Sequence, residues 1–227
     1  MHASFAAKLS RSTRSLAMAG LSLPLLLALT ACDSMYYATM ETFGYAKRDL
    51  LVGRVQDARE SQGEAKETIQ TTFEAFKGLT GFDGGELETQ YNKFKSLYDG
   101  SVQRAGTVTD RIASIEEVST AMFDEWGQEI AEIQSSDLRA KSERLKADTE
   151  SSYVHLLGTM KAAEERMKPV LAAFKDQVLF LKHNLNAAAI NSLESESQKI
   201  QSEVASLIED MQEAIDEADE FIESLPK

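Results

Sequence analysis

The chain of 227 residues lacks most of the residues from which disulfide frameworks, nucleotide sites and metal sites are built. Its one cysteine, Cys32, excludes a disulfide framework and a cysteine-rich metal centre. No glycine-rich run is followed by Lys-Ser or Lys-Thr, so the chain has no phosphate-binding loop for ATP hydrolysis. HExxH and GxSxG sequences are also absent. We therefore predict that the protein is not an enzyme and has no cofactor and no metal site.

Basic residues are scarce, since 24 Lys and Arg stand against 37 Asp and Glu and give a net charge of −13. Three of these basic residues and none of the acidic ones lie before Cys32, so the remainder is still more acidic. An acidic surface repels nucleic-acid phosphates, which excludes a nucleic-acid partner. Long apolar stretches are also few. Leu16 to Leu29 has 14 residues, which is fewer than the about 20 that a membrane-spanning helix needs.

That apolar stretch follows a short basic segment, which is typical of a secretory signal peptide. It leads into Leu29-Thr30-Ala31-Cys32, which resembles the lipobox of bacterial lipoproteins, in which the cysteine receives diacylglycerol. We expect residues 1–31 to be the signal peptide and residues 32–227 to be one domain, tethered to the membrane by acyl chains such as palmitate on Cys32. In the alternative interpretation, the signal is an ordinary secretory one and Cys32 is incidental.

The residue after the cysteine, Asp33, resembles the signal that retains enterobacterial lipoproteins in the inner membrane. It favours the inner over the outer membrane as a possible sorting residue. The tethered domain is expected to face the periplasm.

Only two prolines, Pro169 and Pro226, follow Cys32, and this part of the chain is rich in residues that favour long helices. From residue 51 to residue 79, core positions recur at alternating steps of four and three, which is the heptad pattern of a coiled coil. They are Leu51, Val55, Ala58, Gln62, Ala65, Ile69, Thr72, Phe76 and Leu79. Four glycines within residues 78–85 then predict a turn.

Similar patterns predict a second helix over 86–135, a third from Asp137 to about Leu185 and a last one that ends at Leu225. Leu138 and Leu145 are among the core positions of the third. The Ser135-Ser136-Asp137 cluster is expected to supply a cap for the third helix and Asn186 one for the last helix, although one unbroken helix over 137–225 is the alternative. The second helix would be about 75 Å long, so we extend the first back to near Met35 to match it. The predicted fold is all-α, an elongated antiparallel bundle of three or four long coiled-coil helices.

Two core positions of the first helix, Gln62 and Thr72, are polar and lie among small residues. They predict either a hydrated stretch of the core or a partner contact, and replacing them with Leu and Val is expected to stabilise the isolated domain. Phe82, in the glycine-rich turn, is a further possible partner contact. The alternative is that its ring folds back and caps the bundle.

Three stretches of the sequence resemble one known family: 44–59, 81–87 and 180–187. They begin with Gly44-Tyr45-Ala46-Lys47, Gly81-Phe82-Asp83-Gly84 and Phe180-Leu181-Lys182-His183. Together they resemble a family of Gram-negative lipoproteins that is classed as a domain of unknown function. The resemblance implies a helical fold and a lipid anchor, and it brings no activity or binding residues.

We expect a lipid-anchored scaffold or adaptor of the bacterial envelope, because long helices with thin cores often complete their packing on a partner. The partner would be another envelope protein or a second copy of the chain. The alternative is an envelope enzyme or ligand carrier that uses a cleft between helices near Trp126, Tyr153 and His155.

Overall fold

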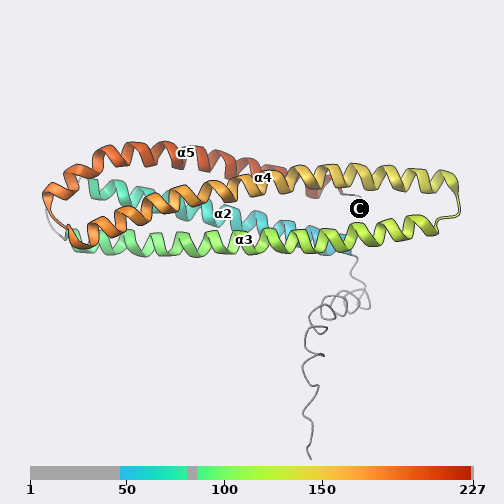
Figure 1. Cartoon of the computed structure of the whole chain (residues 1–227), viewed down its shortest axis with the longest axis horizontal. Coiled ribbons are helices and arrows are strands. Elements are labelled where there is room, and N and C mark those ends of the chain that lie inside the picture. Colours follow the sequence, from blue (N-terminus) through green and yellow to red (C-terminus); the bar gives the residue numbers. More distant parts are fainter. Residues whose placement is uncertain (1–46, 81–85, 226–227) are drawn as a thin grey trace, which may run out of the picture. The chain divides into compact units, whose positions relative to one another are not determined.

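The heptad patterns fold into long helices in the computed structural model, which describes residues 47–80 and 86–225. Within these ranges four helices and no strands occur (Figure 1). The helices are α2 (Lys47–Thr80), α3 (Leu87–Glu132), α4 (Ser136–His183) and α5 (Ala187–Ser224). All four belong to one compact unit, Tyr45–Lys227. The prediction of an all-α bundle of long helices is confirmed.

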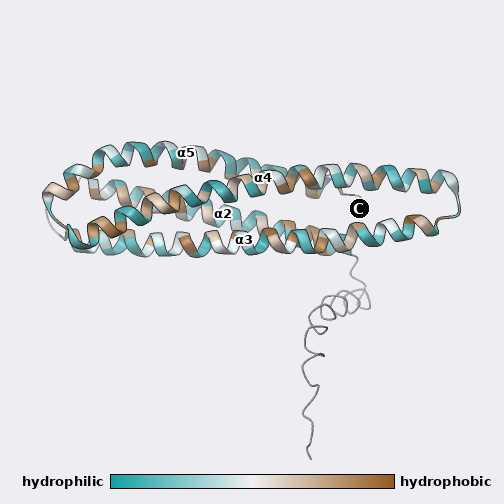
Figure 2. Ribbon diagram, viewed as in Figure 1, coloured by the Kyte–Doolittle hydropathy of each residue, from teal (hydrophilic) through white to brown (hydrophobic). Residues whose placement is uncertain are grey.

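Each helix packs against two neighbours in a ring. α2 lies between α3 and α5, and α4 lies between the same two helices on the opposite side. Helices that are consecutive in the chain run in opposite directions, as short connections require. Hydrophobic and hydrophilic segments alternate along all four helices (Figure 2), and the apolar ones supply the shared core.

The core of α2 follows the predicted heptad without exception, since the nine predicted side chains from Leu51 to Leu79 have no exposed surface. The core of α5 is similarly regular, with buried side chains at Ile200, Val204, Leu207, Met211, Ala214, Ala218 and Phe221. This regular burial explains why helices with many polar residues remain associated.

Ion pairs tie the helices together outside the core. Arg59 of α2 lies 2.6 Å from the Asp219 carboxylate of α5, and Arg166 of α4 lies 2.5 Å from Asp210 of α5. Both carboxylates belong to the acidic C-terminal part of the sequence. These pairs are largely exposed, so each adds at most about 1 kcal/mol to stability.

The helix ends follow the predicted caps. Ser135 precedes α4, and its hydroxyl accepts a hydrogen bond from the Leu138 amide. Asn186 precedes α5, and its side-chain oxygen accepts one from the Ala189 amide at 3.0 Å. The alternative of one unbroken helix over 137–225 is wrong, because the chain leaves helical geometry after His183. The predicted start of the first helix near Met35 lies outside the described residues.

α3 and α4 continue together beyond the ends of α2 and α5 (Figure 1). We call the part that α2 and α5 do not accompany the hairpin extension: residues 126–132 of α3, the connection 133–135 and residues 136–146 of α4. Leu138 and Leu145 were predicted as core positions, yet their side chains are 60% and 42% exposed. That prediction is wrong because, of the described helices, only α3 and α4 reach this level, and these two alone leave both leucines open to solvent.

Candidate functional site

Three of the predicted site residues lie outside the described residues. They are the lipid-attachment residue Cys32, the possible sorting residue Asp33 and the possible contact Phe82. Their roles therefore stay predictions from the sequence.

The two polar core positions of α2 lie within the bundle. The side chains of Gln62 and Thr72 have no exposed surface, so a partner could reach them only if the helices separated. The Thr72 hydroxyl donates a hydrogen bond to the Thr68 carbonyl at 2.8 Å, and its oxygen lies 2.8 Å from the Ser101 hydroxyl of α3. Because the Thr72 proton is already used, Ser101 is the donor in this second bond. Thr72 therefore has a full set of partners inside the protein.

Ser101 is a core residue that sequence analysis missed. It is buried, and it lies three residues after Tyr98, where the heptad pattern of α3 places a core position. The neighbouring Asp99-Gly100 pair and the polar nature of serine concealed the position. The buried Thr72–Ser101 bond changes the expectation for Thr72, because valine at residue 72 would leave the Ser101 hydroxyl without its acceptor.

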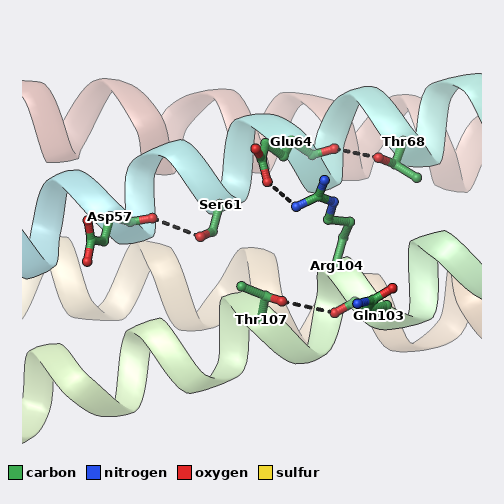
Figure 3. A network of polar contacts seen from close by, with 7 residues as sticks. All are labelled: Asp57, Ser61, Glu64, Thr68, Gln103, Arg104 and Thr107. Carbon is green, nitrogen blue, oxygen red and sulfur yellow. Dashed lines mark hydrogen bonds and ion pairs between the residues drawn. The ribbon is translucent and has the colours of Figure 1, made fainter.

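Gln62 differs from Thr72 because neither its side-chain nitrogen nor its side-chain oxygen has a hydrogen-bond partner. Polar residues near Gln62 in the sequence of α2 do have partners (Figure 3). The Ser61 and Thr68 hydroxyls donate to backbone carbonyls one turn earlier on α2, and Arg104 of α3 pairs with Glu64 of α2. An unpartnered buried amide destabilises the fold by about 1–3 kcal/mol.

The three residues of the alternative cleft take part in contacts between helices. The Trp126 indole nitrogen donates to the Ser142 hydroxyl at 2.9 Å, which joins α3 to α4. The Tyr153 ring packs on Phe123 with the ring centroids 5.6 Å apart, and burial raises the pKa of its phenol. Both aromatic residues therefore belong to the α3–α4 contact.

The third residue of that cleft, His155, faces α5, where its Nε2 atom lies 3.1 Å from the Glu217 carboxylate. It borders an open groove of about 480 Å³ between α4 and α5. The groove is lined by Ser151, Val154, His155, Gly158, Thr159, Ala162 and Glu213. Among the described residues no group of three or more His, Cys, Asp or Glu side chains is arranged to hold a metal ion.

Among the described helices, none combines the length and the apolar character that crossing a membrane requires.

The largest exposed apolar side chains of the four helices concentrate on α4. Leu138 and Leu145 lie on the hairpin extension, Val154 borders the groove, and Leu179 and Phe180 lie near the C-terminal end of the helix. In contrast, Gln62 and Thr72 of α2, which the sequence predicts as possible partner contacts, are buried inside the bundle. The exposed large apolar side chains of the described residues therefore lie mainly on α4, with Val102 of α3 in addition.

The family described as "Protein of unknown function (DUF2959)" matches residues 36–225. The chain belongs to this family. Neither a curated protein nor a solved structure matches the chain. The resemblance to a family of unknown function is thus confirmed over nearly all of the region after Cys32, and it assigns no activity.

Proposed function

We propose that this member of the DUF2959 family is a lipid-anchored, periplasm-facing helical scaffold or adaptor of the bacterial envelope. The observation that carries the proposal is Leu29-Thr30-Ala31-Cys32 directly after an apolar stretch of 14 residues. Acyl chains on Cys32 would hold the bundle at the membrane, because each buried methylene contributes about 0.8 kcal/mol. The protein would then bind another envelope protein or itself.

The bundle supports an adaptor role in two ways. Its core is used for helix packing, and its open features are apolar side chains on α4 and ion pairs between helices. Long helices of this kind present extended surfaces, and partner helices bind such surfaces through apolar residues at heptad spacing.

The anchor is tested by replacing Cys32 with alanine in the full chain and labelling cells with a palmitate analogue. We expect label on the wild-type protein and none on Cys32→Ala, which would be soluble or unprocessed. A Cys32→Ser variant is a matched control, since it keeps the size of the side chain and loses the thiol. Label that persists in both variants would overturn the lipoprotein proposal.

The groove between α4 and α5 favours a second candidate, an envelope enzyme or ligand carrier. His155 and Glu213 are the titratable groups that line it. His155→Gln and Glu213→Gln test this candidate, with the exposed Glu203→Gln of α5 as a matched control. Loss of a cellular phenotype in the first two variants, at unchanged protein level and melting temperature, would favour the enzyme or carrier over the adaptor.

A further inference from the structure

Of the four described helices, only α3 and α4 reach the hairpin extension. No residue from 131 to 155 is buried, although every helix is well buried elsewhere. Leu138 and Leu145 are seven residues apart and therefore lie on one face of α4. A face with exposed leucines at heptad spacing is incomplete as a coiled-coil core.

The position of this face on α4 indicates where further helices would pack against the extension. The buried line of α4 runs through Leu156, Met160 and Ala163. Continued towards the N-terminus at heptad spacing, it passes residues 149 and 142. Leu145 and Leu138 lie four residues before these two positions, so they flank the line along which α4 packs against α3 and α5 farther along its length.

The two helices of the extension carry opposite charges. Residues 126–132 of α3 contain two carboxylates, Glu129 and Glu132, and no basic residue, whereas residues 136–146 of α4 contain four basic residues and two carboxylates. The side chains of Glu129, Glu132, Lys141 and Arg144 are exposed. Within the part of the chain that the structure describes, these four side chains form no ion pair, and the Arg144 Nε atom donates to the Ala140 carbonyl of its own helix. Each helix could therefore pair with the oppositely charged helix of another molecule.

We propose that the hairpin extension is the site at which two copies of this chain associate. The extensions of the two copies pack on each other and complete a four-helix section, with α4 of each copy beside α3 of the other. The contact is twofold symmetric, so the same residues act on both sides. The whole chain has a net charge of −13, which makes two copies repel each other. The basic stretch of α4 supplies an attraction between the two copies at the extension.

A second copy fits this surface better than an anionic lipid surface does. Carboxylates such as Glu129, Glu132 and Glu143 lie among the basic residues of the extension and would meet lipid phosphates unfavourably. In a dimer the same carboxylates become partners of Lys141 and Arg144.

The dimer is expected to be weak in solution. Residues 136–146 of α4 span only about 16 Å, so the contact buries less than the about 1,200 Å² of standard stable complexes. Confinement of both copies to one membrane raises their effective concentration, and in this respect the inference rests on the proposed lipid anchor. The charge pairs also make association sensitive to salt.

A charge exchange between two full-length copies with different epitope tags tests the proposal. One variant is Lys141→Glu/Arg144→Glu, and the other is Glu129→Lys/Glu132→Lys. The readout is capture of one tagged copy with the other after crosslinking in cells. Each variant expressed alone should lose capture by about tenfold or more, because like charges then face each other. Coexpression of the two should restore capture, since both halves of the contact again carry opposite charges.

Lys175→Glu/Lys182→Glu is the matched control, since both lysines are exposed on α4 outside the extension. It should leave capture at the wild-type level. Capture that is unchanged in the single variants, or that coexpression does not restore at equal protein levels, would overturn the proposal. A lipid surface would replace the second copy as the partner if the wild-type chain showed no capture and the variants pelleted differently from wild type with phosphatidylglycerol vesicles. Palmitate labelling reports the anchor independently, so failure of the anchor and failure of the dimer are distinguishable.

Discussion

Gln62 offers the sharpest test of the described core, because its amide is fully buried and has no hydrogen-bond partner. Replacing it with leucine removes an unsatisfied polar group, which is worth about 1–3 kcal/mol. Leucine also restores an apolar side chain at a heptad core position between Ala58 and Ala65. For a domain of this size, each kcal/mol shifts the melting temperature by about 2–4 °C. Gln62→Leu should therefore raise the melting temperature by about 2–12 °C.

Thr72→Val is the contrasting variant on the same helix. It removes the acceptor of the Ser101 hydroxyl and leaves that buried group unsatisfied, so the melting temperature should fall. Thr72→Val/Ser101→Ala removes both partners and should be close to neutral. The stability loss of Thr72→Val and Ser101→Ala added together should thus exceed that of the double variant.

The assay is thermal and urea unfolding of residues 45–227, followed by far-ultraviolet circular dichroism. A lower melting temperature for Gln62→Leu would contradict the claim that the buried Gln62 amide destabilises the fold. It would mean that the amide is satisfied by buried water or that leucine does not fit at this position. Stabilisation by Thr72→Val would show that the Thr72–Ser101 bond contributes nothing.

Three further predictions concern the anchor, the hairpin extension and the bundle. Asp33→Ser should move the anchored protein from the inner-membrane to the outer-membrane fraction on a sucrose gradient, and an unchanged distribution would contradict a sorting role. Amide hydrogens of residues 131–150 should exchange faster than those of residues 91–123, because the extension buries no side chain after Ile130. Equal protection of the two ranges would show that another element covers the extension. Residues 45–227 should scatter X-rays with a radius of gyration clearly above the compact-globule value of about 16 Å, since α4 alone, with 48 residues, is about 72 Å long; a value near 16 Å would contradict the bundle.

Much of the fold follows from local patterns that the sequence displays openly. Steps of four and three locate the buried face of α2 from Leu51 to Leu79, because helix periodicity alone decides which side chains share a face. Ser135 and Asn186 mark helix starts because their side chains satisfy amides that no helix turn can reach. These features depend on neighbours within one turn.

The remaining features depend on contacts between distant segments. The heptad pattern identifies Leu138 and Leu145 as one face of α4, but whether that face is covered depends on how far α2 and α5 extend alongside it. Ser101 was missed because its burial depends on a hydroxyl of another helix rather than on its own hydropathy. Trp126 and Tyr153 were predicted to lie near a cleft between helices, and both side chains are used in the α3–α4 contact. The anchor at Cys32 is a sequence motif that packing does not reveal.

Crosslinking of the full-length chain in living cells, followed by mass spectrometry of the captured peptides, tests the adaptor role most directly. We expect the wild-type chain to capture an envelope protein or a second copy, with crosslinks on exposed residues of α4, and we expect Cys32→Ala to reduce this capture. The adaptor role would be contradicted if the wild-type chain captured no protein above the Cys32→Ala background while His155→Gln abolished a cellular phenotype at unchanged protein level.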